Sequence, residues 1–338
     1  MNTCPRFEHL LVLPHLQVHN ANAVSSPLTH GFPSMTAFLG VMWALERKAR
    51  ECGLDLAFKA VGVVCHDHQE LVTGNGALRP LQVEAFRLTR NPVGKDGKTA
   101  AIVEEGRIHL ELSLVLAVSS ERWQRTPDAW EEDAAHLAEL LAGMRIAGGT
   151  LRPPQHPGRP RYRPWRVDLT GTGHDQAAQF RKARMRLLPG STLVLREDRL
   201  AARLAELQQV DPAASQLDAW LSLARINWHS DPPGANGKSV WHNDRKGQGW
   251  IVPIPVGYGA LGDLLPPGSV AGARDPEVPF RFVESLYSVG EWVSPHRLQS
   301  ATQLLWYADS SPEDGRYRCR NDYRPVADDL LEPLYEID

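Results

Sequence analysis

The alternation of apolar and polar residues over the first 150 positions predicts strands and helices in turn. Residues 10–18 have the pattern of a β-strand, and a loop rich in Asn, Ser, Pro and Gly follows at 20–33. From 34 to 52 the apolar residues recur at helical spacing, with a serine at the N-cap position and a glycine after the last turn. A second strand is expected at 58–65.

A turn-rich stretch, 74–106, comes next, and its Asp96-Gly97 pair is a strong hairpin signal. Residues 107–118 are the longest strand candidate, because their apolar side chains alternate at first and then run on. An amphipathic helix is expected at 127–144, and a short strand begins near 148–151.

The order strand, helix, strand, hairpin, strand, helix, strand predicts an α+β protein. Its core would be ferredoxin-like or RRM-like (βαββαβ), with a β-hairpin arm inserted at about 74–106 before the third strand. We expect residues 1–152 to form this core. Residues 153–338 would form an elaborated mixed α/β C-terminal half that completes one compact subunit.

The C-terminal half differs from the first half in composition and in its pattern of apolar residues. Residues 153–166 are rich in Pro and Arg and do not resemble a regular element. Beyond them we expect a helix at 175–188, a strand at 191–196, and two helices near 198–209 and 215–227. Residues 230–249 have the composition of a loop, and the remainder mixes strands with short helices.

Composition indicates a soluble globular protein, with 42% hydrophobic and 23% charged residues. No stretch approaches the roughly 18 apolar residues that a membrane helix needs. The N-terminus lacks a basic region before its apolar run, so we interpret it as a strand and not a signal peptide. The four cysteines are scattered, which predicts neither a disulfide framework nor a zinc site and fits a reducing cytoplasm.

Charge is unevenly distributed along the chain. The net charge is −3, yet residues 145–203 carry 13 Lys and Arg against 4 Asp and Glu, a local net of +9, and the rest sums to −12. A basic stretch of this kind is typical of a protein that binds a polyanion. The alternative is a solvated region whose arginines pair with acidic neighbours, and charge alone does not decide between the two.

No motif indicates catalysis or a cofactor. The sequence GANGKS at 234–239 resembles a phosphate-binding loop but has proline where that loop needs its first glycine. His66 and His68 have no second ligand pair, so we expect no metal. A metal-independent endoribonuclease needs few residues, however, and His66, His68 and His109 would be its candidate acids or bases.

Four stretches have the chemistry of single-stranded RNA binding, in which cations hold phosphates while bases stack or form hydrogen bonds. They are the loop 20–34, the basic hairpin of 87–98, the paired glycines of 144–150, and the basic run 181–186. The alternatives are a self-capping loop, a solvated hairpin, a tight turn and a solvated helix. The candidate RNA contacts are Asn22, Ser25, Ser26, Arg90, Arg145, Gly148, Gly149, Arg181, Arg184 and Arg186.

Several stretches, in order along nearly the whole chain, resemble the second Csy subunit family of type I-F CRISPR systems, in the Cas-five group of the RAMP superfamily. They are NANAVSSPLTHGFPS (20–34), VGVVCH (61–66), LTRNPVGKDGKTAAIVEEGRIHLELSL (88–114), MRIAGGT (144–150), MRLLPG (185–190), GWIVPIPVGYGAL (249–261) and RFVESLYSVGEWVSPHR (281–297). The segments 151–180 and 228–246 and the C-terminal tail resemble it least.

The resemblance implies a non-catalytic subunit of the Csy (Cascade) surveillance complex in antiviral defence. Such a subunit has a ferredoxin-like core with a hairpin arm, binds the 5′ handle of the CRISPR RNA, pairs with the large subunit at the tail, and abuts a backbone subunit. Target DNA near its PAM is a further possible partner. Two other hypotheses stay open: an endoribonuclease that processes repeat RNA, and a protein–protein scaffold that docks partners through residues 281–307.

Overall fold

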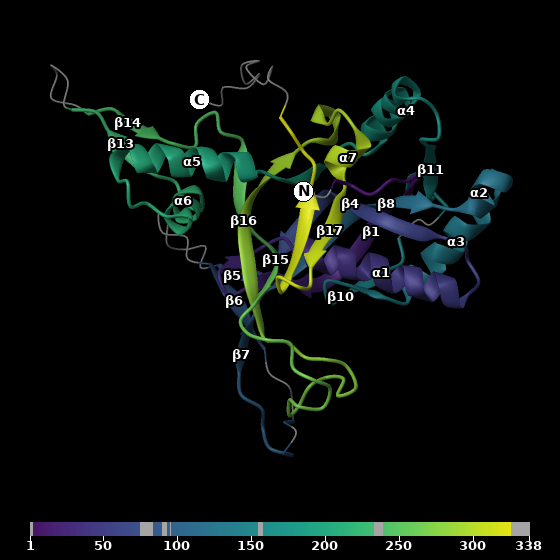
Figure 1. Ribbon diagram of the computed structural model, residues 1–338, viewed down its shortest axis with the longest axis horizontal. Helices are drawn as coiled ribbons and strands as arrows, with labels where there is room; N and C mark the ends of the chain where they lie inside the picture. Colours follow the sequence, from purple (N-terminus) through teal and green to yellow (C-terminus); the bar gives the residue numbers. More distant parts are fainter. Residues whose placement is uncertain are drawn as a thin grey trace.

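Four antiparallel strands form the centre of the fold (Figure 1). They lie in the order β4 (Ala57–Glu70), β8 (Arg107–Ser119), β1 (His9–Asn22) and β10 (Gly149–Arg152). β10 forms a hairpin with β9 (Arg145–Ile146), and β11 (Trp165–Asp168) pairs with the first residues of β1. The structure is a computed structural model that describes residues 3–74, 84–89, 93–94, 96–154, 158–232 and 239–325.

Two helices cover one face of these strands. α1 (Met35–Glu51) begins at Ser34, whose hydroxyl accepts a hydrogen bond from the Thr36 amide, as the sequence predicted for an N-cap. α3 (Ala129–Ala142) follows the short α2 (Glu121–Arg125). Leu11 and Leu13 of β1 belong to the apolar cluster between the strands and these helices.

The opposite face is covered over only part of its length. α4 (Gly173–Arg186), which a Thr172–Asp175 capping box starts, packs there with η2 (Pro295–Arg297) and α7 (Ala301–Leu304). Leu10 and Val12 of β1 lie in this second cluster. η1 (Pro160–Tyr162) lies against β1 beyond it.

Strands from the C-terminal half extend the same sheet from β4. Their order is β12 (Ser191–Leu195), β16 (Val283–Val293), β15 (Trp250–Ala260), β18 (Arg316–Asn321), β17 (Trp306–Ser311), then β4. β12 also pairs with β4, so these six strands close into a ring. Because β4 and β1 pair with strands from beyond residue 152, hydrogen bonds join the two halves.

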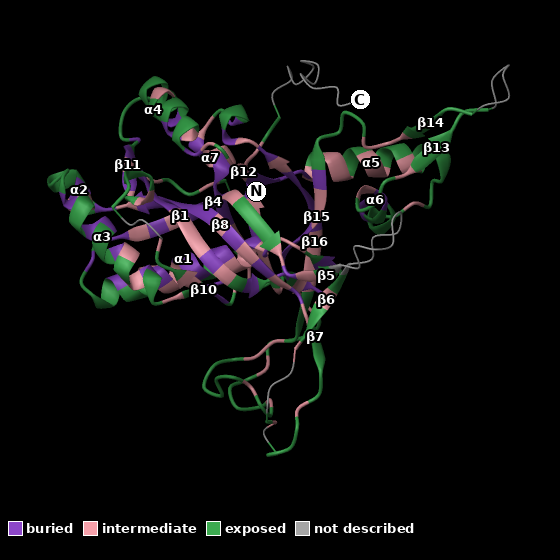
Figure 2. Cartoon of the chain, turned by 180° about the vertical axis from the view of Figure 1, so that it is seen from behind, coloured by how far each residue is buried: buried purple, intermediate pink, exposed green. Residues whose placement is uncertain are grey.

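Two extensions project from one end of this body (Figures 1 and 2). One is an arm of β5 (Val72–Gly74), β6 (Glu84–Thr89) and β7 (Val103–Glu105). The other is the segment 261–282 between β15 and β16, which contains the Leu265–Phe280 bridge. Elsewhere, β2 (Val24–Ser26) and β3 (Thr29–His30) make a small hairpin.

A separate lobe contains α5 (Glu197–Val210), α6 (Gln216–Leu223), β13 (Trp228–Ser230) and β14 (Trp241–Asn243). The predicted loop at 230–249 is therefore wrong in part, because residues 241–243 within it form β14 and pair with β13. Local composition hides such a hairpin, since cross-strand hydrogen bonds supply its order.

The observed architecture is a mixed α+β fold, built on a large antiparallel sheet and, within the described residues, seven α-helices. The helices expected near 175–188, 198–209 and 215–227 are confirmed as α4, α5 and a shorter α6. No helix in the described part of the chain is long and apolar enough to cross a bilayer.

Candidate nucleic-acid interface

The structure divides the sequence-predicted contact residues between two ends of β1. Asn22, Ser25, Ser26 and the 145–149 turn meet where β1 ends, because the Asn22 amide donates to the Ala147 carbonyl oxygen at 2.8 Å. The basic run 181–186 lies on α4, which packs over the start of β1. Arg90 lies outside the described residues. The candidates therefore form two groups, not one surface.

In the loop 20–34, side chains mostly hold the loop itself. The Asn22 side chain donates to the Val24 carbonyl oxygen at 2.7 Å and accepts from the Val24 amide at 3.1 Å. Ser25 accepts from the Ser34 amide, and the buried Ser26 hydroxyl lies 2.6 Å from that of Thr29. Asn22 is the exposed member of this group, whereas the Ser26 hydroxyl is buried and stabilises the turn through Thr29.

The paired glycines make a tight hairpin turn. Ala147 and Gly148 have φ of 48° and 78°, the signature of a two-residue type I′ connection between β9 and β10. Gly149 is buried against β1, where a Cβ atom would lie 2.7 Å from Val18 Cγ1 and 2.8 Å from the Ala21 amide nitrogen. The turn thus brings Arg145 to the sheet edge, and Arg145 itself is exposed.

On α4 the arginines have different environments. The Arg184 guanidinium donates to the Leu298 carbonyl oxygen. That of Arg186 lies over the Trp165 ring, 4.0 Å from its centroid. Arg181 is exposed on the outer side of the helix. Two of the three predicted contacts are thus engaged in holding α4 to the body.

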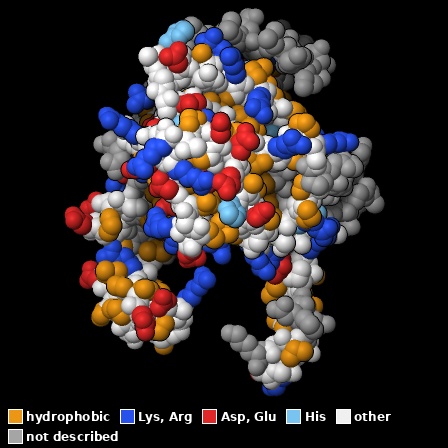
Figure 3. Space-filling model, turned by 90° about the vertical axis from the view of Figure 1, so that its right-hand side faces the viewer, with side chains coloured by type: hydrophobic (Ala, Val, Ile, Leu, Met, Phe, Trp, Pro, Cys, Tyr) orange, Lys and Arg blue, Asp and Glu red, His pale blue; other side chains and the backbone are white. Residues whose placement is uncertain are grey.

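The basic segment 145–203 does not form the single cationic surface that its net charge suggested. Arg161 pairs with Glu111, Arg196 is buried between Asp198 and Glu291, and Arg203 pairs with Glu206 and Asp244. Several of these acids come from outside the segment, so folding neutralises charge that the sequence segregates. Figure 3 shows the result on the side seen there, with blue and red side chains interspersed.

A different surface emerges where the second face of the sheet is open. Its side chains are aligned by strand register: Arg145 pairs with Thr150, Thr150 with His19, Arg152 with Gln17, and Gln17 with Glu111. On β8 and β4, His109 pairs with Gln69 and Glu111 with Asp67. We call this surface the polar sheet face; it comprises Gln17, His19, Asp67, Gln69, His109, Glu111, Arg145, Thr150 and Arg152.

Histidine rings stack along this face. The His19 and His109 ring centroids are 4.5 Å apart with an interplanar angle of 28°, and the Asn20 amide donates to His109 Nδ1 at 3.1 Å. Partial burial, followed by His19, Arg87 and Arg152, lowers the pKa of His109. The neutral ring therefore prevails at neutral pH, and it can stack on a base or form a hydrogen bond with it.

A second histidine pair lies at the border with the covered half. His15 and His66 stack at 4.2 Å, and His15 Nδ1 lies 2.7 Å from Glu111 Oε1. His66 Nδ1 lies 2.6 Å from the Pro189 carbonyl oxygen, which can only accept, so this nitrogen is the donor. Burial lowers the pKa of His66 although the Pro189 contact opposes it.

The carboxylate of Glu111 anchors that border. Burial alone would raise its pKa, but hydrogen bonds from Gln17 and His15 and the charge of Arg161 lower it below the ordinary value. Arg161 Nη2 donates to Glu111 Oε1 at 2.8 Å. Glu111 is therefore ionised near neutral pH and orders the basic groups around it.

The candidate nuclease histidines are not assembled into one site. His66 stacks on His15, and His109 stacks on His19. His68 pairs with Leu110, whose side chain faces α1, so it lies on the opposite face from His109. No three His, Cys, Asp or Glu side chains among the described residues are grouped to hold a metal ion.

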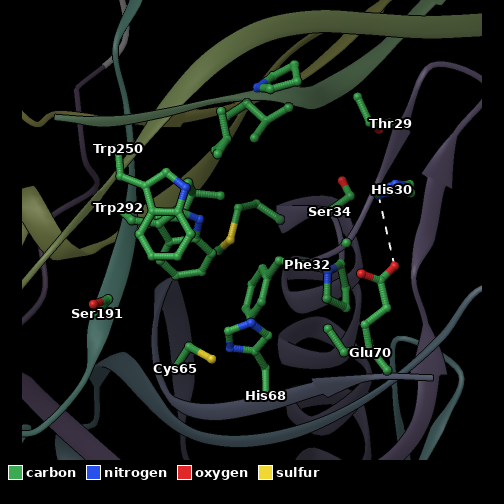
Figure 4. A pocket seen from close by; sticks show the side chains of 18 of the residues that line it. Thr29, His30, Phe32, Ser34, Cys65, His68, Glu70, Ser191, Trp250 and Trp292 are labelled. Atoms are coloured by element: carbon green, nitrogen blue, oxygen red, sulfur yellow. Dashed lines mark ion pairs between the residues drawn. The ribbon is translucent and has the colours of Figure 1, made fainter. Parts of the chain in front are cut away.

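Across the edge of β4 from the polar sheet face lies a pocket of about 440 Å³. It opens where β12 stops pairing with β4, and its walls come from 29–35, 65–70, 190–193 and the strands β15 and β16. Figure 4 shows Trp250 and Trp292 at one end, Phe32 and Ser34 in the middle, and Glu70 beside His30 at the other end. Trp292 is only half-buried, whereas Trp306 is buried.

Sequence reasoning missed Gln17, His19 and Arg152 as surface residues. The signal was present as alternating polar positions within 16–19 and 107–111. What was missing was the strand register, which places these side chains beside Arg145. The pocket was missed because its walls come from segments more than 200 residues apart.

Comparison with known proteins identifies a family for this chain, both by family model and by sequence identity. The family model described as CRISPR-associated protein (Cas_Csy2) matches residues 11–319. The chain is 43% identical over 318 residues to CRISPR-associated protein Csy2 of Pseudomonas aeruginosa (strain UCBPP-PA14), an alignment that covers 92% of this chain and 94% of that protein. The family match runs from β1 into β18 and so includes the polar sheet face and the pocket.

Proposed function

The chain belongs to the Csy2 family of CRISPR-associated proteins and is a subunit of a type I-F CRISPR complex, and from that premise we propose that it binds the 5′ handle of the CRISPR RNA on the polar sheet face. The observation that supports this most is the row of Arg145, Thr150, His19, His109 and Gln69 across five adjacent strands. It combines a cation, hydrogen-bonding groups and stacked rings on one open surface.

Each class of side chain has a part in this proposal. Arg145 and Arg152 hold phosphates, while His19 and His109 offer ring faces and ring nitrogens to unstacked bases. Asn22 contacts the RNA at the end of β1. Ser25, Ser26 and Gly149 act indirectly, because their hydrogen bonds and close packing fix the loop and turn that present Asn22 and Arg145.

The basic residues of α4 have a secondary role in the proposal. Arg181, exposed on α4, is available to a further stretch of polynucleotide. Arg184 and Arg186 bind the Leu298 carbonyl oxygen and the Trp165 ring, and both would have to exchange these partners to reach RNA. Arg90 and Gly148 stay predictions for contact with the handle.

We propose that residues 1–152 form a ferredoxin-like unit and that residues 153–338 complete a single subunit with it. The strand order β4-β8-β1-β10, with α1 and α3 on one face, supports the first part. The hydrogen bonds of β11 to β1 and of β12 to β4 support the second.

Pairing with the large subunit and a backbone subunit is also part of the proposal. The block 281–307 is largely taken up by β16, η2 and α7, which pack into the body. The extensions are better placed, since Leu88 and Val103 of the arm and Leu264, Val278 and Phe282 of the segment 261–282 are exposed. The open space between two projections is visible in Figure 3.

A direct test measures binding of the purified full chain, alone and with its copurifying subunits, to labelled CRISPR RNA and to RNA with a scrambled handle. We expect preference for the authentic handle, and log affinity that falls with log salt by about 0.7 per phosphate neutralised. Equal binding of both RNAs would contradict recognition of the handle.

The same preparation tests the non-catalytic assignment. The scattered positions of His66, His68 and His109 support it, and we expect repeat RNA to stay intact during incubation with EDTA. Defined cleavage that disappears in a His66→Ala or His109→Ala variant would establish the endoribonuclease alternative instead.

A further inference from the structure

The pocket across the edge of β4 from the polar sheet face has one wall of aromatic rings that are accessible to a ligand. The Trp250 side chain is 62% exposed, and its ring centroid lies 6.4 Å from that of the half-buried Trp292. Phe32 meets Trp292 edge-on at 4.9 Å and stacks on Phe38 behind it. A large exposed indole over a supported aromatic floor is a surface on which a flat ring can stack.

The opposite end of the pocket offers a hydrogen-bond acceptor. Oε1 of Glu70 is covered from solvent and has no hydrogen-bond donor among the described residues. Its ion-pair partner, His30 Nδ1, lies 4.0 Å away, which is too far for a hydrogen bond. A carboxylate that lacks a donor gains free energy when its side chain turns to accept a hydrogen bond from a ligand N–H group in the pocket.

No Lys or Arg lines the pocket, so it has no group to hold a phosphate. Its wall residues His68, Glu70 and Ile108 face α1, so the pocket lies on the opposite face of the sheet from the polar sheet face. The two sites meet across the edge of β4 at His66 and Asp67, which also line the pocket. Its volume of about 440 Å³ lies within the range of small-molecule sites, roughly 300–1,000 Å³. A base of an RNA strand that passes round this edge of β4 can enter the pocket without its phosphate.

We infer that this pocket receives one unpaired base of the bound RNA, stacked on Trp250, and that Glu70 selects bases that carry an amino group. Adenine, cytosine and guanine present such a donor. Uracil has no amino group, and its imino N–H lies between two carbonyl oxygens. A carboxylate repels these oxygens. The inference rests on the proposed RNA-binding function and adds a base-reading site to it.

The test uses the full chain and labelled homopolymers of adenosine, cytidine and uridine, with binding followed by anisotropy and tryptophan fluorescence. We expect Trp250→Ala to weaken the adenosine and cytidine oligomers by about tenfold and to remove most of the fluorescence quenching. Trp250→Phe should retain stacking. Trp241→Ala is the matched control, because Trp241 is also 62% exposed but belongs to β14 in the separate lobe.

Glu70→Gln tests the selection of the base. Since an amide both donates and accepts, the variant should bind the uridine oligomer about as well as the others, while the wild type prefers adenosine or cytidine severalfold. A wild type without preference, or a preference that Glu70→Gln leaves unchanged, would overturn the role of Glu70.

Failure of the pocket and failure of the proposed function are distinguishable. If the wild type binds RNA and Trp250→Ala binds it equally, the pocket inference is wrong while RNA binding stands. If Trp250→Ala keeps RNA affinity but no longer copurifies with other subunits, the pocket holds a protein side chain instead. If the wild type binds no RNA at all, both proposals fall.

Discussion

The two halves of one sheet face differ in what covers them. At the start of β1, Leu10 and Val12 lie in an apolar cluster beneath α4. Farther along the same strand and on the same face, Gln17 and His19 meet Arg152 and Thr150 and are left without a covering helix. One half stabilises the subunit, and the other half presents a polar surface.

A bulge in β1 makes this division possible. Before it, even-numbered residues such as Leu10 and Val12 point to the second face, and after it odd-numbered residues such as Gln17 and His19 do. The register shift between Leu13 and Leu16 changes the alternation, so Leu16 and Val18 still face α1 and α3. The apolar face stays continuous while the other face changes from apolar to polar.

The largest effect is expected from a substitution in the covered half, which should lower stability but not RNA affinity. Phe180 of α4 is buried in the second cluster, and Phe180→Ala should lower the free energy of unfolding by about 3–5 kcal/mol. RNA affinity per folded molecule should stay unchanged, because the polar sheet face lies elsewhere. Urea denaturation with and without RNA checks both statements, and Phe180→Leu serves as a milder variant should the first not fold.

Gly149→Ala should affect both stability and binding. The added methyl group would meet Val18 and the Ala21 backbone, so β10 must shift away from β1 at a cost of about 1–3 kcal/mol. Arg145 and Thr150 move with it, and RNA affinity should fall. The control is Gly148→Asn in the same turn, where positive φ suits Asn and no neighbour is within 4 Å. Similar losses of stability in both variants would contradict the packing argument.

Removing charge from the open half should affect binding alone. Arg145→Ala with Arg152→Ala should weaken the handle complex roughly tenfold, about 1.4 kcal/mol, and reduce the salt slope by about 1.4. Thermal stability should change little because both residues are exposed. The matched control removes Arg47 and Lys48 from the outer side of α1; if it has the same effect, the charge acts through the field of the whole protein and not at this face.

The smallest effect is expected from pH. Burial lowers the pKa of His9, which lies at the start of β1 beside Trp123 with neither ring nitrogen hydrogen-bonded. The unfolded chain therefore binds a proton that the folded chain excludes, so stability is fully present above about 6.5 and is lost as the pH falls below it. Urea midpoints across this range should decline less steeply in His9→Gln. An equal decline would assign the effect to other groups, His66 first.

Local patterns sufficed for most elements of the fold. The serine cap of α1 and the period of α3 depend on residues close together in the sequence, where capping and helix periodicity act. The ring of strands around β15 and β16 was not predictable, because β12 and β17 pair with β4 across more than 100 residues. No local pattern specifies such pairing.

The candidate site divides in the same way. Arg145, Asn22 and the paired glycines were found from composition and turn chemistry alone. Arg152, Gln17 and His19 required register, and Trp250 with Glu70 required the approach of distant strands. The charge argument was misleading for the opposite reason: Glu111, Glu291 and Asp244 reach the basic segment only after folding.

The sequence by itself determined the family, the α+β character and the order of elements in the first half, because these follow from ordered motifs and from periodicities of about 2 and 3.6 residues. Tertiary structure alone decided which arginines stay free, which half of the sheet face stays open, and that an aromatic pocket borders it. Charge neutralisation, register and close packing all join residues far apart in the chain, and they exist only once the chain has folded.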